Sequence, residues 1–204
     1  MTLPLPIVAP PPRAVWSDTV KTCADWKPEG WSNMLREFDD ASIYQTWAHE
    51  LVHWGERHMN HHIVKKNDTV AAIAQVRVFR VPGVNAGIAY VLRGPLWQKR
   101  GEKRDPDVFR HAIRGLKQHY VTQQGLLLRI APNVVEDEGG PLADILLAEG
   151  FVQGENTNSL RTVMLDLSPS MDDLYRNLRY GWRRGFRKTL KYAFSFETGT
   201  TEEL

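Results

Sequence analysis

The hydrophobic and polar positions of the chain recur with the two periods that distinguish helices from strands. Apolar residues fall at spacings of three and four from Glu29 to Phe38 and from Ser42 to about His58, which predicts two helices. The second segment has an apolar stripe formed by Tyr44, Trp47, Leu51 and Trp54. We expect this stripe to face the core, and His49 and His53 on the other side of the helix to face solvent.

After these helices the chain alternates between extended and helical patterns. Strands are predicted at residues 61–66, 69–81, 85–95, 125–132, 159–167 and 194–199, and helices at 104–124, 139–151 and 168–193. Asn67 and Asp68 predict a tight turn between the first two strands, and Asp105 with Pro106 predicts a helix start. This order indicates a mixed α/β sheet covered by helices.

The composition is that of an ordinary globular protein. The 204 residues are 42% hydrophobic and 25% charged, with a formal net charge of +2. The single cysteine, Cys23, excludes disulfide frameworks and cysteine-rich zinc sites and suits a reducing compartment. No apolar run approaches the roughly 20 residues that cross a bilayer. Residues 1–14 are rich in proline, and we expect them to form a disordered arm.

The segment His49-Glu50-Leu51-Val52-His53 contains the H-E-x-x-H pattern of zinc peptidases. On a helix, two histidines one turn apart can share a zinc ion while the glutamate activates the bound water. A third ligand is also required, and Gly55 and His58 each come one residue too early for the metzincin spacing. We therefore interpret the histidines as a solvated helix face and expect no metal. A zinc metallopeptidase is kept as an alternative function.

The predicted helix at residues 168–193 is strongly basic. Its apolar stripe is formed by Leu174, Leu178, Trp182, Phe186 and Leu190. Its cations are Arg176, Arg179, Arg183, Arg184, Arg187, Lys188 and Lys191. Guanidinium groups suit phosphate, and adjacent aromatic rings suit a sugar or a base. The helix therefore predicts a site for a phosphate-rich ligand, and a solvated charged face is the alternative. A non-catalytic phosphate or nucleic-acid binding module is a second alternative function.

Arg93-Gly94-Pro95 ends the predicted strand at residues 85–95, and Tyr90 lies three residues before Arg93. An arginine at the mouth of a sheet, followed by a turn with little side chain, leaves room for a ligand. The alternative is an ordinary strand end with a tyrosine in the core.

Several stretches together resemble the FemA/FemB-type aminoacyltransferases and their GNAT-fold relatives, including the BioF2-like acetyltransferase domain proteins. The stretches are SIYQTWAHELVHWG, VPGVNAGIAYVLRGPLW, LLLRIAPN, LLAEGF, RTVMLDLSPSMDDLYRNL and WRRGFRKTLK, spread over about residues 30–199. The last stretch resembles the family's W-R-x-x-x-R-K-A pattern through Trp182, Arg183, Arg187 and Lys188. Gly185 and Thr189 depart from the asparagine and alanine that are usual in the family.

The resemblance implies an α/β, GNAT-like fold, which is the acyl-CoA N-acyltransferase fold, with a mixed sheet flanked by helices. It implies a first GNAT-like domain at residues 15–167. Residues 168–204 would then be the basic helix and the strand that begin a second, truncated GNAT-like domain. The capping-box pair Thr200 and Glu203 favours a helix start at the end of the chain.

The function implied by the resemblance is N-acyltransfer. An aminoacyl or acyl group would pass to an amine of a cell-wall (peptidoglycan) or polysaccharide precursor, from an aminoacyl-tRNA or acyl-CoA donor. This chain would mainly bind the acceptor, through Tyr90, Arg93, Trp182, Arg183, Arg187 and Lys188. The implied location is the cytoplasm, with a peripheral contact at the inner membrane surface and no contact with DNA.

The GNAT resemblance also makes the loop after the central strand a candidate for coenzyme A. Backbone N–H groups in a Q/R-x-x-G-x-G/A pattern would cradle its pyrophosphate. The segment from Gln98 to Lys103 places a lysine where the last small residue should be. We therefore predict no coenzyme A binding and no other cofactor in this domain. The chain also has no Ser-His-Asp or Cys-His pattern that would indicate covalent catalysis.

Overall fold

The computed structural model describes residues 14–84, 86–133, 139–154, 165–192 and 194–195. The chain divides into two compact units, residues 1–153 and residues 154–204. The first unit contains β1 (Trp16–Thr22), α1 (Pro28–Leu35), α2 (Trp47–Trp54), β2 (Met59–Lys66), β3 (Thr69–Arg80), β4 (Gly87–Leu92), α3 (Pro106–Leu116), β5 (Leu127–Ala131) and α4 (Gly139–Ala148). The second unit contains α5 (Met171–Asn177) and α6 (Tyr180–Thr189).

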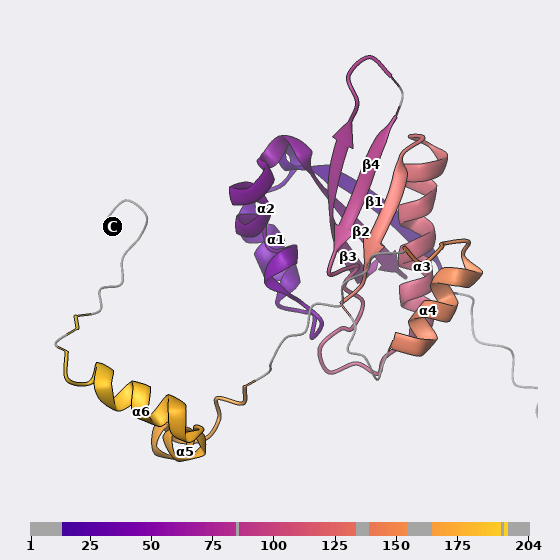
Figure 1. The fold of residues 1–204 in the computed structure, drawn as a ribbon. Helices are drawn as coiled ribbons and strands as arrows, with labels where there is room; N and C mark the ends of the chain where they lie inside the picture. The colour runs from indigo at the N-terminus through magenta and orange to yellow at the C-terminus, as the bar shows by residue number, and fades with distance from the viewer. Residues whose placement is uncertain (1–13, 85, 134–138, 155–164, 193, 196–204) are drawn as a thin grey trace, which may run out of the picture. The chain divides into compact units, whose positions relative to one another are not determined.

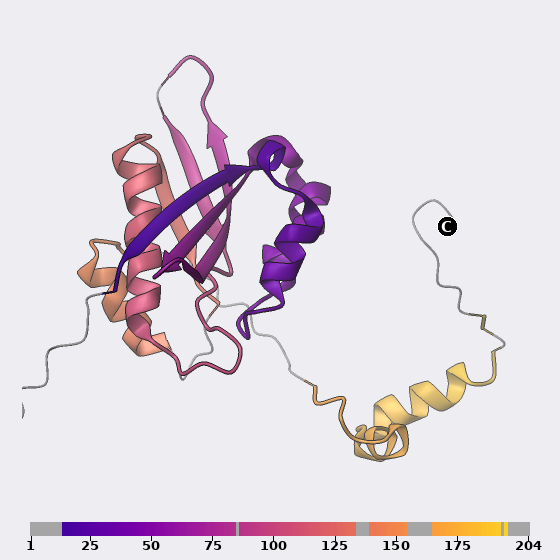
Figure 2. The ribbon, with the colours of Figure 1, turned by 180° about the vertical axis from the view of Figure 1, so that it is seen from behind.

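The first unit is a five-stranded sheet between two layers of helices. The strand order is β1-β2-β3-β4-β5, with antiparallel pairs from β1 to β4 and a parallel β4–β5 pair. A parallel pair needs a crossover connection, and α3 provides it. Figures 1 and 2 show α1 and α2 on one face of the sheet and α3 and α4 on the other. The mixed α/β architecture predicted from the alternating pattern is therefore confirmed.

Most predicted strands and starts of helices are found in the structure. The predicted strands at residues 61–66, 69–81, 85–95 and 125–132 correspond to β2, β3, β4 and β5. Asn67 and Asp68 form the turn between β2 and β3 with φ of 50° and 63°. The Asp105 side chain caps α3 by accepting a hydrogen bond from the Asp107 N–H at 3.1 Å.

Strand β1 was not predicted from the sequence. It pairs with β2 along its whole length, from Trp16 opposite Lys66 to Thr22 opposite Asn60. It lies at the edge of the sheet, and none of its residues is buried. An edge strand of this kind lacks the strict alternation of apolar and polar residues by which a half-buried strand is recognised.

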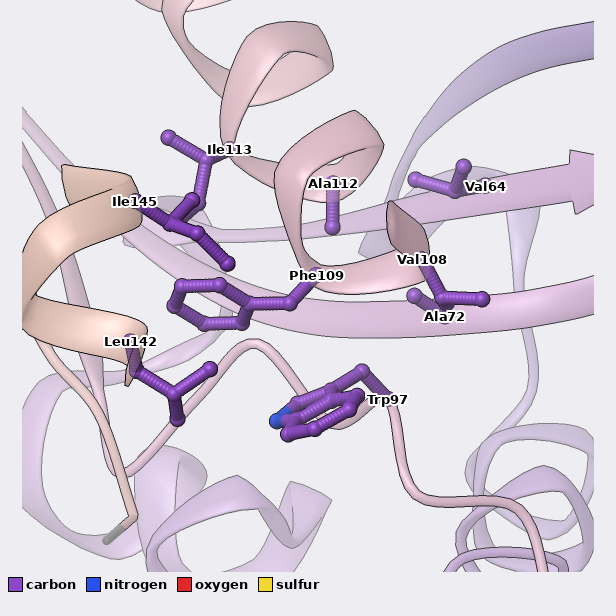
Figure 3. Packing of buried hydrophobic residues seen from close by; sticks show 9 residues of the cluster. All are labelled: Val64, Ala72, Trp97, Val108, Phe109, Ala112, Ile113, Leu142 and Ile145. Carbon is purple, nitrogen blue, oxygen red and sulfur yellow. The ribbon is translucent and has the colours of Figure 1, made fainter. Parts of the chain in front are cut away.

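Each face of the sheet has its own core. Under α1 and α2 the buried residues are Trp31, Leu35, Phe38, Trp47, Met59, Ile63, Ile73 and Leu96. On the other face, Phe109 of α3 lies among Leu142, Ile145 and Trp97, as Figure 3 shows. The ring centroids of Trp97 and Phe109 are 5.7 Å apart. The loop after β4 thus takes part in the packing that holds α3 and α4 on the sheet.

The helix predicted from Ser42 to His58 is shorter than expected, and its stripe was assigned wrongly. Residues Ile43–Gln45 form a separate 3-10 turn, and α2 begins after the cap Thr46. Trp47 is buried as predicted, but Leu51 and Trp54 are 45% and 44% exposed. Glu50, which was not expected in the apolar stripe, is buried. The break at Thr46 changes the rotation of α2, and a buried partner for Glu50 makes its inward position possible.

The single helix predicted at residues 168–193 is two helices. The chain leaves helical geometry at Leu178 and Arg179, where ψ is 140° and 149°. Gly181 and Gly185 lower the helix propensity of this segment, and its closely spaced cations repel one another. None of the described residues of α5 and α6 is buried. Most of the predicted strands at 159–167 and 194–199 lies outside the described residues, as does almost all of the arm at 1–14.

His61 on β2 is a fully buried, uncharged group. Its ring centroid lies 4.4 Å from that of Trp31 and 5.0 Å from that of Trp47. Neither ring nitrogen has a hydrogen-bond partner among the described residues. Burial lowers the pKa of His61 to about 4, because the protonated ring would lose its hydration between two indoles.

This buried histidine predicts a loss of stability in acid. The unfolded chain takes up a proton near pH 6.5 and the folded chain only near pH 4, so the free energy of unfolding falls as the pH falls through that window. We expect His61→Leu to abolish about 2–3 kcal/mol of this loss by pH 4.5. Urea unfolding of both proteins at pH 7 and pH 4.5 measures the difference. Equal losses in the two proteins would contradict the assignment.

Candidate functional site

Tyr90 lies at the centre of a row of three side chains that crosses β3, β4 and β5. Arg77 is the partner of Tyr90 in the β3–β4 ladder, and Arg129 is its partner in the β4–β5 ladder. Residues in register on neighbouring strands point to the same face of a sheet. The guanidinium carbons of Arg77 and Arg129 lie 5.7 Å and 5.5 Å from the Tyr90 ring centroid. We call these three residues the Tyr90 row.

The outer end of the Tyr90 row reaches solvent. Helices α1 and α2 pack over β2 and β3, and their core contains no residue of β4 or β5. On the same face of β5, Arg129 is exposed and Leu127 is 69% exposed. The opposite face of β4 and β5 is buried against Leu116 and Tyr120. Among the described residues nothing covers this half of the sheet, which we call the uncovered half, so it offers a surface on which a ligand can lie against Tyr90.

The inner end of the row is held by α2. Both carboxylate oxygens of Glu50 pair with Arg77, one of them accepting from Arg77 Nε at 2.9 Å. The Arg77 and Glu50 side chains are only 7% and 5% exposed. The indole of Trp54 lies over the guanidinium with 4.2 Å between ring centroid and Cζ. A bidentate pair in a desolvated position fixes Arg77 in one orientation, so Tyr90 has a rigid cationic neighbour.

Arg93 lies just beyond the end of β4. Its φ of 52° places it in the left-handed region, which directs its side chain away from the regular strand path. Its guanidinium carbon lies 5.9 Å from the Tyr44 ring centroid. Tyr44 in turn meets His49 edge-on, with the centroids 5.1 Å apart. The segment before α2 therefore supplies an aromatic surface beside Arg93.

The Gln45 side chain connects the segment before α2 to β3 and β4, the two strands that carry Arg77 and Tyr90. The Gln45 carboxamide donates to the Leu92 carbonyl at 2.6 Å and accepts from the Gln75 N–H at 2.7 Å. The Trp31 indole N–H donates to the Gln45 carbonyl at 2.7 Å. A Cβ at Gly94 would lie 3.0 Å from Gln45 Nε2, so a larger residue there would have to displace the Gln45 side chain slightly. The Gln-Thr-Trp and Arg-Gly-Pro motifs of the sequence thus touch in the fold.

The histidines of the H-E-x-x-H pattern do not form a metal centre. The rings of His49 and His53 stack with centroids 4.3 Å apart. Glu50, which a zinc peptidase would need as its base, is paired with Arg77 instead. Among the residues that the structure describes, no group of three or more histidines, cysteines, aspartates and glutamates could hold a metal ion. The zinc peptidase alternative therefore has neither its base nor a third ligand in this part of the chain.

The loop after β4 uses its backbone N–H groups within the protein. Trp97 and Gln98 donate to the Asp40 carboxylate at 3.0 Å and 3.2 Å. The Leu96 and Arg100 N–H groups donate to backbone carbonyls of Ile73 and Glu37. Burial raises the pKa of Asp40 to about 6 despite these two bonds. A pyrophosphate cradle needs free N–H groups, and these four are already engaged within the protein.

The other four residues expected at the site belong to the second unit. Trp182 is 74% exposed on α6. Arg187 Nε donates to the Tyr175 hydroxyl at 2.7 Å, which joins α6 to α5. A hollow of about 530 Å³ is lined by Tyr180, Arg183, Arg184, Arg187, Lys188 and Lys191. In the first unit Tyr90 therefore lies between Arg77 and Arg129, and Arg93 lies beside Tyr44. In the second unit Arg183, Arg187 and Lys188 line one hollow.

The residues that surround Tyr90, namely Arg77 with its partner Glu50 and Arg129, were not predicted from the sequence. Arg77 occupies an inward position of a mostly apolar strand, and a charge in such a position is a signal of a buried partner. Glu50 was noticed only as the possible base of a zinc peptidase, and its partner Arg77 was not predicted. Arg129 carries no local signal, because its proximity to Tyr90 depends on the register of β4 and β5.

Comparisons with known proteins bear on the fold. No protein-family model and no curated protein matches the chain. Among solved structures, FemX matches with a TM-score of 0.61 and 17% identity over 81% of this chain. The chain spans 42% of the length of FemX. A second match is a probable acetyltransferase, with a TM-score of 0.47 and 9% identity, covering 74% of this chain and 99% of that one. A third is the aminoglycoside acetyltransferase meta-AAC0020 from an uncultured soil metagenomic sample, with a TM-score of 0.45 and 11% identity, covering 74% of this chain and 97% of that one. The chain therefore has an α/β, GNAT-like fold of the kind found in FemX.

Proposed function

We propose that the chain is part of an N-acyltransferase of the FemA/FemB type and that it binds the acceptor. The acceptor would be a cell-wall or polysaccharide precursor that carries phosphate or carboxylate groups beside a sugar. The observations that support this proposal are the Tyr90 row, which reaches solvent at Arg129, and Arg93 beside Tyr44 just beyond the end of β4. Guanidinium groups pair with phosphate and carboxylate, and Tyr90 and Tyr44 offer rings that pack against a sugar.

The remaining site residues of the proposal are Trp182, Arg183, Arg187 and Lys188. Their supporting observation is the cationic hollow on α6, which suits a phosphate group of the acceptor or of an aminoacyl-tRNA donor. The donor would be an aminoacyl-tRNA or an acyl-CoA. We assign donor binding to neither the Tyr90 row nor the loop after β4, since the backbone of that loop is already bonded.

Direct acyl transfer fits this chain better than a covalent intermediate. The reaction needs a neutral amine, a held acyl donor and donors of hydrogen bonds to the developing oxyanion. Cys23 is no nucleophile, because burial, with the charge of Glu56 adding to it, raises the pKa of its thiol to about 11. In the proposed mechanism, Arg93 and Arg129 hold the anionic part of the acceptor and so orient its amine. Arg77, fixed by Glu50, orients Tyr90.

The test is the affinity of the chain for a UDP-linked muramoyl peptide, measured by calorimetry. We expect binding that Arg93→Ala and Arg129→Ala each weaken by about tenfold or more, since a hydrogen bond to a charged group contributes about 1.5–3 kcal/mol. Arg93→Lys should recover part of the lost affinity, because lysine keeps the positive charge but cannot form the bidentate hydrogen bonds of a guanidinium.

Arg100→Ala is the matched control, since Arg100 is an exposed arginine whose partner is Asp39 in the loop region. It should bind as the wild type does. Equal weakening by Arg93→Ala and Arg100→Ala would show that general charge, and not the Tyr90 row, determines the affinity. No binding of any sugar-linked or peptide-linked phosphate by the wild type would overturn the proposal.

A further inference from the structure

His49, in the first turn of α2, has one ring nitrogen beside a carboxylate. Its side chain is 14% exposed, although the sequence predicted a solvated position. Nδ1 is buried, has no hydrogen-bond partner among the described residues and lies 3.7 Å from Glu50 Oε1, the oxygen that also pairs with Arg77. This distance is too long for a hydrogen bond but short enough for electrostatic attraction. The carboxylate therefore favours a proton on Nδ1, which leaves the lone pair on Nε2.

His49 lies next to the residues that are proposed to bind the acceptor. Its ring meets Tyr44 edge-on, with 5.1 Å between the centroids, and the Arg93 guanidinium carbon lies 5.9 Å from the Tyr44 ring centroid. Nε2 of His49 belongs to the exposed part of the ring and has no partner among the residues that the structure describes. A ligand that places an anion on Arg93 and packs on Tyr44 can therefore extend to this nitrogen.

The other side chains near this surface that could accept a proton are already engaged or lie farther from Tyr44. Both oxygens of Glu50 are used by the ion pair to β3. Both ring nitrogens of His58 have partners, a backbone carbonyl at 3.0 Å and a neighbouring arginine at 2.9 Å. His53 is exposed, donates from Nδ1 to the His49 carbonyl at 2.7 Å, and has no ring contact with Tyr44 among the described residues. Tyrosine hydroxyls and guanidinium groups hold their protons at neutral pH.

We propose that His49 is the general base of the acyl transfer and takes a proton from the acceptor amine on Nε2. The inference rests on the proposed function and adds a catalytic residue to its acceptor site. A primary amine is protonated at neutral pH, and its ammonium form has no lone pair with which to attack. The ammonium N–H donates to Nε2 and the proton passes to the ring, which becomes an imidazolium beside the Glu50 carboxylate.

The rest of the reaction follows from the neutral amine. Its nitrogen forms a bond to the acyl carbon of the donor, and the bond from that carbon to the leaving oxygen or sulfur breaks. A second proton of the amine goes to the leaving group, and the imidazolium of His49 returns its proton to water. The products are an amide, the free alcohol or thiol of the donor, and one proton.

The experiment measures how pH changes the affinity of the full chain for a UDP-muramoyl peptide whose free amine is a lysine side chain. A neutral imidazole accepts from the ammonium group and a protonated imidazole repels it, so the affinity should fall as the pH falls. We expect the dissociation constant, measured by calorimetry, to be at least about threefold higher at pH 6 than at pH 8. At pH 6 the binding should release protons, which makes the binding enthalpy depend on the ionisation enthalpy of the buffer.

Two variants and a second ligand isolate the contribution of His49. His49→Gln should keep most of the affinity at pH 8, because its amide oxygen also accepts from the ammonium group, but should lose the pH dependence and the proton release. His53→Gln is the matched control, the same substitution one turn further along α2, and should behave as the wild type does. A peptide with norleucine in place of lysine has no amine and should bind the wild type without this pH dependence, a comparison that needs no variant.

Three outcomes would overturn the inference. One is an equal pH dependence of the wild type with the lysine and the norleucine peptide. The second is proton release by His49→Gln that matches the wild type, and the third is its loss in His53→Gln alone. In all three the peptide still binds, so the proposed function stands. If the wild type bound neither peptide, the proposed function itself would be overturned, and this inference with it.

Discussion

Replacement of Glu50 by alanine should lower the free energy of unfolding by about 3–5 kcal/mol, the cost of leaving one charge of a buried pair without its partner. The Arg77 guanidinium would stay charged in a position that is 7% exposed, with only the Trp54 and Tyr90 rings beside it. Urea denaturation, followed by far-UV circular dichroism, measures the change. Tyr90 should lose its fixed neighbour at the same time, so the acceptor affinity should fall as well.

Two further variants separate the ion pair from other causes. Glu56→Ala removes an exposed glutamate in the turn after α2 and should change the free energy of unfolding by less than about 0.5 kcal/mol. Glu50→Leu with Arg77→Met removes both charges and should recover much of the lost stability, since apolar residues can replace a buried pair. Glu50→Ala with wild-type stability would show that the pair is not buried in solution.

Replacement of Trp31 by alanine should cost about 3–5 kcal/mol of unfolding free energy, because it removes the largest side chain of the core under α1 and α2. The change also removes the indole N–H that donates to the Gln45 carbonyl. Gln45 would then hold β3 and β4 less firmly. Amide hydrogen exchange at Gln75, whose N–H donates to the Gln45 side chain, should rise more than exchange in α3.

Trp182→Ala provides the comparison, as the same substitution at a tryptophan that is 74% exposed. It should leave the unfolding free energy within about 0.5 kcal/mol of the wild type. Equal effects of the two substitutions would contradict the burial of Trp31.

The parts of the fold that were predictable depend on local pattern. The extended patterns of β2, β3 and β5 and the Asn67-Asp68 turn are properties of neighbouring residues, and the structure has them where they were expected. Strand β1 was not predictable in this way. Neither of its faces is buried, so apolar residues do not have to recur at every second position. The predicted rotation of α2 was wrong because the helix begins only after Thr46. The preceding residue, Gln45, instead bonds to β3 and β4, two strands far along the chain.

The candidate site was predictable only where a motif marked it. Tyr90 and Arg93 were predicted through the Arg-Gly-Pro motif; the structure places Tyr90 in a row with Arg77 and Arg129, and Arg93 beside Tyr44 just beyond β4. Arg77, Glu50 and Arg129 lie beside Tyr90 through strand register and through an ion pair between residues 27 positions apart. Such pairings are set by tertiary packing, which a single sequence does not display.

The Gln45 contact has a consequence for how this domain tolerates changes in length. Strands β3 and β4 are tied to the start of α2 by one carboxamide and not by a ladder of backbone bonds. Residues can therefore be inserted or deleted in the turn after α2 without a shift in strand register. The segment between α1 and Gln45 should be less tolerant, because Phe38 is buried and Asp40 accepts hydrogen bonds from the Trp97 and Gln98 N–H groups. In a screen of random insertions, accepted insertions should accumulate in the turn after α2 and be absent from residues 44–47 and 92–96, where the Gln45 side chain lies against Leu92 and Gly94.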